Sequence, residues 1–206
     1  KPFDEFFHKG MVTTCISLLS ESGLNPDLAF TFSDEISLWF TRLPFNGRVE
    51  KIDSVAASFA ASALTLAFGG TTLLSFDARV IPATPAFALE YLAGRQSEAW
   101  RNHINAYCQQ ALMEEGMDSR AAAEQLRGLP AQALHEMMHE RGFNLATTPA
   151  WQRRGTLVYK KRTIKEGFNP VTQETVATER SSVVAESDLP LFTTPEGQDF
   201  LNGILC

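Results

Sequence analysis

The chain has 206 residues, 44% of which are hydrophobic, and its formal net charge is −6. This composition suits one globular domain with an appendage, and it excludes a chain that is disordered throughout. No run approaches the roughly 20 apolar residues of a membrane span, and the opening residues have no signal-peptide pattern, so we expect a soluble, cytoplasmic protein with no membrane partner. The negative charge by itself gives no indication of a nucleic-acid partner.

The three cysteines, Cys15, Cys108 and Cys206, show no Cys-x-x-Cys spacing. This argues against a disulfide framework and against a structural zinc site. We therefore expect free thiols with no part in the chemistry.

The first half of the chain alternates helical and strand-like patterns. Two aromatic, β-prone runs flank the polar tripeptide Ser33-Asp34-Glu35, which predicts a hairpin with carboxylates at its tip. The predicted elements are a helix at residues 3–19, strands at 28–32 and 36–40, a helix at 51–68 and a strand at 75–82.

The second half is first helical and then strand-like. Asp118 and Pro130 are residue types that favour helix starts. The predicted elements are one long helix or two broken near Gly94 over residues 86–113, helices at 119–126 and 130–139, strands at 155–164 and 175–184, and a helix at 194–205. Residues 167–170 separate the two strands, which predicts a second hairpin.

This order of elements does not form a regular βαβ repeat, so the prediction is an α+β fold in which helices cover a sheet. The late hairpin predicts an extension beyond that sheet. We expect two regions, a domain of residues 1–164 and a hairpin and tail of residues 165–206.

The strongest functional feature is the pair of adjacent acids at the predicted hairpin tip. Carboxylates at such a tip project beyond the sheet, where a cation or a triphosphate can reach them. Mg²⁺ prefers oxygen ligands and is usually held by one or two carboxylates together with phosphate oxygens. An acidic turn is also common as solvated surface, so the tripeptide alone leaves both interpretations open.

Six short motifs occur in a fixed order around this turn. They are Lys1-Pro2-Phe3-Asp4, Phe32-Ser33-Asp34-Glu35-Ile36-Ser37, Lys51-Ile52-Asp53-Ser54-Val55-Ala56-Ala57-Ser58-Phe59-Ala60, Phe76-Asp77-Ala78-Arg79-Val80, Tyr91-Leu92-Ala93-Gly94-Arg95-Gln96 and Trp151-Gln152-Arg153-Arg154-Gly155-Thr156. Together they resemble the tRNA(His) guanylyltransferase family, over residues 1 to about 162.

The resemblance implies a palm-like sheet similar to that of polymerases and a transfer of nucleotides, with GTP preferred, to tRNA 5′ ends in the 3′ to 5′ direction. It places Asp34 as a carboxylate ligand of two Mg²⁺ ions, Ser33 beside the bound nucleotide and Glu35 as a second catalytic acid. GTP and ATP are the implied substrates, tRNA is the implied partner, and the implied assembly is a homo-oligomer built as a dimer of dimers.

Further positions follow from the same resemblance. Lys1, Lys51 and Arg79 match cations that the family uses around the triphosphate, and Asn144 matches the same nucleotide-binding region. Without the resemblance, the alternative interpretation is that Lys51 is an exposed helix residue and that Arg79 forms an ion pair with Asp77.

The chain also departs from the family pattern. An Asp-Gly pair that supplies the other metal carboxylate lies upstream of Lys1 in the family, so we expect the opening palm strand to be absent here and the natural protein to continue upstream. His103-Ile104-Asn105 matches only the start of a eukaryotic anticodon-binding signature, which favours the archaeal and bacterial guanylyltransferase-like branch that repairs tRNA 5′ ends. Leu134 stands where relatives often have lysine.

Two other patterns suggest binding sites. His135-Glu136-Met137-Met138-His139 has the His-Glu-x-x-His spacing of a zinc site, but no third ligand is evident beyond a guess such as Glu166. An exposed histidine pair is the alternative that we favour. Arg153 and Arg154 lie in a basic stretch and are candidates for contact with the tRNA backbone.

Two rival functions remain at this point. A nucleotide cyclase also uses acids on a palm hairpin and two metal ions, although it would favour Gly-Gly before the acids, where Phe32-Ser33 stands. A non-catalytic RNA-binding or assembly module is the second rival, and magnesium-dependent GTP binding would distinguish it from an enzyme.

Overall fold

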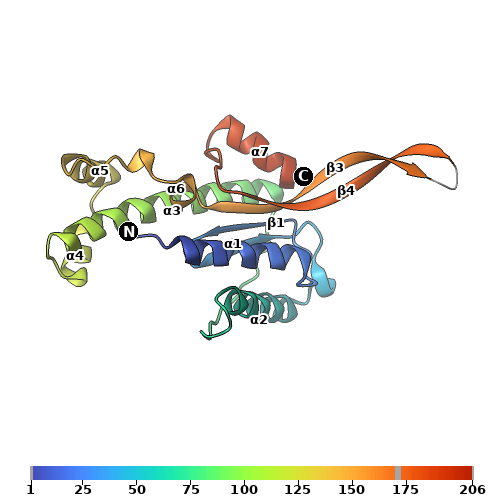
Figure 1. The fold of residues 1–206 in the computed structure, drawn as a ribbon, viewed down its shortest axis with the longest axis horizontal. Helices are drawn as coiled ribbons and strands as arrows, with labels where there is room; N and C mark the ends of the chain where they lie inside the picture. Colours follow the sequence, from blue (N-terminus) through green and yellow to red (C-terminus); the bar gives the residue numbers. More distant parts are fainter. Residues whose placement is uncertain (1, 170–172, 206) are drawn as a thin grey trace.

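The structure is a computed structural model that describes residues 2–169 and 173–205. Its sheet confirms the predicted α+β fold. The strands are β1 (Leu28–Phe32), β2 (Glu35–Trp39), β3 (Thr156–Asn169) and β4 (Glu174–Glu186). They pair antiparallel in the order β2-β1-β3-β4, and helices lie on both faces of the sheet (Figure 1).

Apart from the short α6, which was not predicted, the described helices match the predicted ones to within a few residues. They are α1 (Glu5–Ser20), α2 (Val49–Ala67), α3 (Pro85–Glu114), α4 (Ser119–Leu126), α5 (Ala131–Glu140), α6 (Ala150–Arg154) and α7 (Pro195–Leu205), with 3-10 turns η1 (Pro44–Gly47) and η2 (Leu145–Thr147). Side chains of Asp4, Thr84 and Asp118 cap the starts of α1, α3 and α4. The helix α3 is continuous through Gly94, and none of the described helices is long and apolar enough to span a membrane.

The sheet is buried at its centre because β1 has helices on both sides. All five β1 residues are buried. Leu28, Phe30 and Phe32 point into a cluster with α3 and α7, whereas Ala29 packs against α1. The helix α2 lies outside α1, next to β2, so the layers run from α3 and α7 through the sheet to α1 and then α2 (Figure 1).

The segment at residues 75–82 is not a strand, so that prediction was wrong. A strand needs a neighbouring ladder for its backbone hydrogen bonds, and this segment pairs with no strand in the described part of the chain. Phe76 and Val80 instead pack on the cluster shared by α1, α2 and β2. The apolar pattern of this segment therefore reflects the packing of these two side chains on a core cluster. It does not indicate a position in the sheet.

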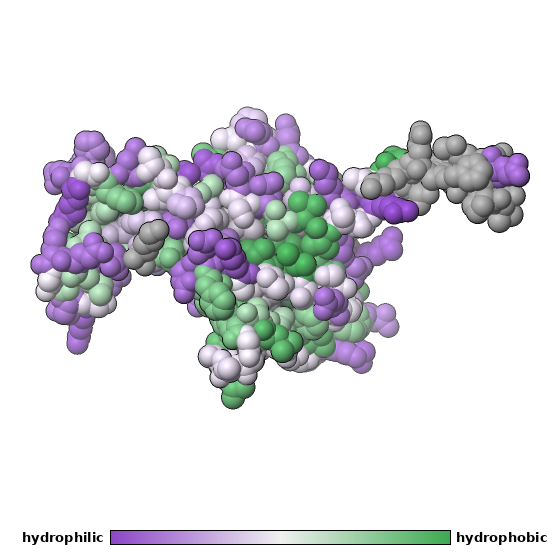
Figure 2. All heavy atoms as spheres, in the orientation of Figure 1, coloured by the Kyte–Doolittle hydropathy of each residue, from purple (hydrophilic) through white to green (hydrophobic). Residues whose placement is uncertain are grey.

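The second half of α3 carries a small helical lobe. Ile104, Cys108 and Leu112 of α3 form a core with α4 and α5, and Leu134 is buried in it. Hydrophilic residues are prominent on the surface of this lobe, and hydrophobic residues gather near the middle of the face around α1 (Figure 2). Cys15 and Cys108 are free, as predicted for them, and both are buried, while Cys206 lies outside the described residues.

The predicted C-terminal hairpin is also confirmed. β3 pairs with β1 only over Thr156–Tyr159, while its ladder with β4 runs on to Asn169, so the two strands leave the sheet as an arm (Figure 1). The turn predicted at residues 167–170 lies partly in β3, and Pro170 is outside the described residues.

Gly155 joins α6 to β3 at a point where a side chain has no room. Its φ is +75°, and an added Cβ would lie 2.6 Å from a ring carbon of Phe30 and 2.9 Å from the carbonyl oxygen of Thr31. We expect Gly155→Ala to lower the free energy of unfolding by about 2–4 kcal/mol, through strain and overpacking.

Denaturant unfolding tests this, with Gly203→Ala as the matched control. Gly203 lies in α7 and an added Cβ would meet nothing within 4 Å, so the same change there leaves stability equal or slightly higher. Equal stabilities for the two variants would contradict the packing described at Gly155.

Candidate functional site

The tip of the β1–β2 hairpin is a two-residue turn that exposes a carboxylate. Phe32 pairs with Glu35 across the ladder, so Ser33 and Asp34 form the turn, and both are exposed. Ser33 has φ +52°, a left-handed conformation that is uncommon for serine. Its hydroxyl donates to the Asp34 carboxylate over 3.0 Å. The predicted acidic tip is therefore confirmed, with Glu35 as the first residue of β2.

The long helix α3 braces this tip through a charged side chain. Arg95 forms an ion pair with Glu35 and a second one with Glu98 of its own helix, at 2.5 Å. Its guanidinium lies over the Phe32 ring at 4.8 Å from the ring centre. One turn earlier, the Tyr91 hydroxyl is 3.0 Å from that of Ser37 in β2, so two side chains of α3 hold the hairpin.

The brace leaves the two acids of the tip in different states. Glu35 is neutralised by Arg95, whereas Asp34 has no cationic partner among the described residues. The free Asp34 oxygens suit a hard cation such as Mg²⁺, which binds one or two carboxylates and completes its shell with phosphate oxygens and water. Two ions would need a further bridging acid; the neighbouring Glu35 is paired with Arg95, and the described side chains contain no group of three metal-binding residues.

Among the residues that the structure describes, neither Lys51 nor Arg79 forms an ion pair with Asp34. Lys51, near the start of α2, is exposed and lies 4.7 Å from the centre of the Phe45 ring. Arg79 is exposed on the irregular segment after α2, and in the part of the chain that the structure describes it forms no ion pair with Asp77. Lys1 lies outside the described residues.

Asn144 belongs to the helical lobe, and its position there has a structural role. Its side chain caps η2 by accepting from the Ala146 amide at 2.9 Å. It also lines a pocket of about 380 Å³ beside α5. No contact joins it to the hairpin tip among the described residues.

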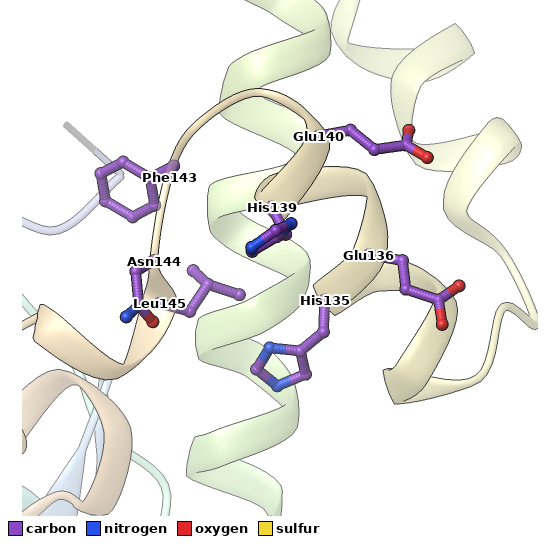
Figure 3. Close-up of a pocket in the computed structure, with 7 residues that line it drawn as sticks. All are labelled: His135, Glu136, His139, Glu140, Phe143, Asn144 and Leu145. Carbon is purple, nitrogen blue, oxygen red and sulfur yellow. The ribbon is translucent and has the colours of Figure 1, made fainter.

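The same pocket contains the His-Glu-x-x-His pattern. His135, Glu136 and His139 all line the pocket, and the Glu136 carboxylate points away from the two imidazole rings (Figure 3). No group of three metal-binding side chains occurs among the side chains that the structure describes, so the two histidines gain no third ligand from them. The side chain of Glu166 is not among those that the structure describes.

Arg153 and Arg154 end α6 and face α3 across a second pocket. Arg153 Nε donates to the Thr148 carbonyl over 3.1 Å, and Arg154 Nη1 donates to the Leu189 carbonyl over 2.5 Å. Burial lowers the pKa of Arg153, the charge of Arg154 lowers it further, and Asp188 opposes the shift. The basic pair is therefore held in place by backbone carbonyls.

An aromatic cluster beside these arginines includes a buried histidine. The ring of His103 stacks on Trp100 at 5.4 Å and on Phe3 at 5.7 Å between centroids. Its Nε2 lies 2.8 Å from the Thr148 hydroxyl, which itself donates to the Leu145 carbonyl, so Nε2 carries the proton. Nδ1 is buried without a partner, and burial lowers the pKa of His103 to about 4.

This histidine predicts a loss of stability in acid. Between pH 6.5 and pH 4 the unfolded chain binds a proton at this position that the folded chain does not, so stability falls as the pH falls. We expect the free energy of unfolding to be roughly 1–2 kcal/mol lower at pH 5 than at pH 7 because of His103. His103→Gln should flatten this dependence; a His103→Gln variant whose stability falls with pH as steeply as that of the unmodified protein would contradict the assignment.

The fold and the site define an α+β protein whose sheet carries an exposed aspartate on a braced hairpin tip. Residues 1–84 match the family model for tRNAHis guanylyltransferase. A Drosophila melanogaster protein named "Probable tRNA(His) guanylyltransferase" is 28% identical over 148 residues, which are 66% of this chain and 52% of that protein. The resemblance found in the sequence is thus confirmed, and the chain spans about half the length of this curated relative.

Solved structures show the same fold. A bacterial tRNA(His) guanylyltransferase-like protein in complex with ATP aligns with a TM-score of 0.74 at 22% identity, over 100% of this chain and 82% of that one. A structure titled as its complex with GTP gives 0.70 at 22% identity, over 100% and 80%. The tRNA(His) guanylyltransferase of Saccharomyces cerevisiae gives 0.67 at 22% identity, over 86% and 79%.

Proposed function

We propose that this protein is a nucleotidyltransferase that adds nucleotides, GTP preferentially, to the 5′ end of tRNA in the 3′ to 5′ direction. The observation that carries the proposal is the exposed Asp34 carboxylate, which has no cationic partner among the described residues and sits on a hairpin tip fixed by α3. The family match of residues 1–84 supports the reaction class. Guanylylation of tRNA(His) and general repair of truncated 5′ ends are both uses of this chemistry.

The proposed substrates are nucleoside triphosphates. Two similar bacterial structures are titled as complexes with ATP and with GTP, which supports both nucleotides as substrates here. In the proposed sequence of steps the tRNA 5′ phosphate attacks the α-phosphate of ATP or GTP, which forms a phosphoanhydride and releases pyrophosphate. The 3′ hydroxyl of an incoming GTP then attacks the 5′ phosphate of the tRNA, and AMP or GMP leaves.

Mg²⁺ is the proposed cofactor, with two ions in the complete site. Asp34 is the residue that would hold it, because its oxygens are exposed and have no cation beside them. When bound, the metal would neutralise triphosphate charge and lower the pKa of the attacking hydroxyl. Because the described residues supply one free carboxylate at the tip, the second ion depends on an acid that they do not include.

The protein's own part is positioning and charge. Glu35 is the second proposed catalytic acid. Its ion pair with Arg95 fixes the orientation of the Glu35 carboxylate and leaves the Asp34 carboxylate unpaired. Ser33 orients Asp34 and offers its hydroxyl to the nucleotide. Lys1, Lys51, Arg79 and Asn144 are proposed to contact the triphosphate region, and the exposed side chains of Lys51 and Arg79 are free to do so.

The partner proposed for the remaining basic surface is tRNA. Arg153 and Arg154 are the proposed contacts to its backbone, since they lie side by side at the end of α6. A homo-oligomer built as a dimer of dimers and a cytoplasmic location complete the proposal, both on the basis of the family resemblance.

Magnesium-dependent GTP binding tests the proposal before any turnover is measured. Isothermal titration of the full-length protein with GTP should give binding that requires Mg²⁺ and weakens at least about tenfold in Asp34→Asn, the loss expected for one charged ligand. The same titration with Asp199→Asn, an exposed acid on α7, should match the unmodified protein. GTP binding that is absent, or that ignores both Mg²⁺ and Asp34, would favour a scaffold over an enzyme.

A further inference from the structure

A second pocket, of about 400 Å³, lies between α3, α6 and the segment that leads into α7. Its base is formed by Arg153 and Arg154, and Trp100 and Leu191 contribute its apolar walls. Residues from three separate stretches of the sequence meet in this pocket. The sequence predicted a role for Arg153 and Arg154 but none for the pocket as a whole.

The two arginines are prepared for an anion. Each guanidinium is held by one hydrogen bond to a backbone carbonyl, and neither has a carboxylate within ion-pair distance in the described part of the chain. The charge of Arg154 disfavours that of Arg153, and Asp188 compensates only in part. Because most guanidinium N–H groups stay available, a phosphate between the two side chains would relieve their repulsion and accept several hydrogen bonds.

The walls fit a flat, aromatic group next to that phosphate. Trp100 is half-buried, and its ring is fixed by contacts with His103 at 5.4 Å and His135 at 5.3 Å between centroids. Leu191 is 47% exposed and adds apolar surface to the pocket lining beside Trp100. Aromatic walls beside a cationic groove are the arrangement by which proteins bind unpaired nucleotides.

Hydrogen bonds hold one side of the pocket against α3, and Gly155, which follows Arg154, packs against Thr31 at the end of β1 that leads to the hairpin tip. Gln96 is 4% exposed, and its amide donates to the Pro190 carbonyl over 3.0 Å and accepts from the Phe192 amide over 2.8 Å. These bonds fix the 190–192 segment against α3. Gln96 is also the neighbour of Arg95, which holds Glu35, so consecutive residues of α3 serve the pocket and the hairpin tip.

From this arrangement we infer that the pocket binds one nucleotide of an unpaired RNA strand, with its phosphate between Arg153 and Arg154 and its base against Trp100. The inference deepens the proposed function and rests on it for the identity of the RNA, which would be the unpaired end of the tRNA acceptor stem. The pocket then holds the strand next to Asp34 while nucleotides are added.

A binding measurement that needs no catalysis tests the inference. We would measure fluorescence anisotropy of a labelled, unpaired oligoribonucleotide of about eight residues, within the site sizes of single-strand binders, with the full-length protein in EDTA. Arg153→Gln combined with Arg154→Gln should weaken binding at least about tenfold and reduce the salt slope by about 1, as expected for the loss of one or two phosphate contacts. The control, Arg42→Gln with Arg120→Gln, removes the same charge from exposed sites elsewhere and should bind within about twofold of the unmodified protein.

Three further variants distinguish a lost contact from a damaged fold. Ser97→Phe places a ring over the pocket from the exposed face of α3 and leaves both arginines in place, so it should weaken binding to a similar degree. Trp100→Leu should weaken binding several-fold without changing the salt slope, while Trp100→Phe should retain most of it. RNA binding that is as tight in the double arginine variant and in Ser97→Phe as in the control would overturn the inference.

Competition identifies the source of the nucleotide. If excess GTP displaces the RNA and itself loses affinity in the double arginine variant without Mg²⁺, the pocket holds a free nucleotide and the RNA assignment is wrong. If RNA binding follows the pocket variants as expected but no nucleotide is ever added to tRNA, the proposed function fails and the pocket assignment stands.

Discussion

Replacing Asp34 with asparagine is expected to reduce nucleotide addition to tRNA at least about 10³-fold, which corresponds to about 4 kcal/mol of transition-state stabilisation. The reason is that Asp34 is the free carboxylate at the hairpin tip and the one proposed metal ligand in the described residues. Its single hydrogen bond, to Ser33, is on the surface, so the free energy of unfolding should change by less than about 0.5 kcal/mol. Initial rates of 5′ extension, measured alongside denaturant unfolding, check both numbers.

Asp199→Asn is the matched control because it removes one exposed carboxylate from α7. Its rate should equal that of the unmodified protein. An Asp34→Asn variant that extends tRNA at more than about a tenth of the normal rate would remove Asp34 from the metal site.

Replacing Arg95 with alanine is expected to have the second-largest effect, a fall of about 10²-fold in kcat together with about 1–3 kcal/mol of lost stability. Arg95 is mostly buried and joins α3 to the hairpin through Glu35 and the Phe32 ring. Removal of the Arg95 side chain takes away one contact that holds the hairpin tip, and it leaves the carboxylates of Glu35 and Glu98 without their cationic partner. Arg95→Lys should recover part of the stability but little of the rate, because lysine cannot reproduce the planar contacts.

A double-mutant cycle with Glu35→Gln distinguishes positioning from general destabilisation. If Arg95 acts through Glu35, the double variant is little worse than the poorer single variant, and kcat changes more than KM. Independent effects of the two substitutions, multiplying in kcat, would show that Arg95 has a separate role.

The sequence predicted most of the elements because their patterns are local. Apolar spacing, Asp118 as a helix cap and aromatic runs on either side of Ser33-Asp34 act within a few residues. The strand predicted at residues 75–82 was wrong because a strand exists only when it pairs with another strand. An alternating pattern in one segment does not indicate which strand, if any, it pairs with. The division between residues 1–164 and 165–206 stays a prediction; β3 runs across that boundary, and α7 packs on the core of α3.

The candidate site was predicted in part for the same reason. Asp34 could be predicted as an exposed acid because the position of a residue in a tight turn depends only on its neighbours in the sequence. The ion pair of Arg95 with Glu35 could not be predicted, because it joins positions 60 residues apart and forms only when α3 packs on the sheet. The spacing of Tyr91 and Arg95, one helical turn apart, was the only local sign that one face of α3 carries polar contacts. Arg153 and Arg154 were candidates because they lie in a basic stretch, but the pocket that they line could not be predicted, because its lining comes from three segments of the chain.

The most direct test of the central claim is the position of the newly added nucleotide. The full-length protein would be incubated with Mg²⁺, ATP, α-labelled GTP and either a 5′-truncated tRNA or tRNA(His), each with its 3′ end blocked by periodate oxidation. Label recovered in the 5′-terminal fragment after nuclease digestion, and lost with Asp34→Asn, is the predicted result. A protein that folds normally and binds GTP yet adds label to neither blocked tRNA, or adds it only where the 3′ end is free, would contradict 3′ to 5′ nucleotide addition.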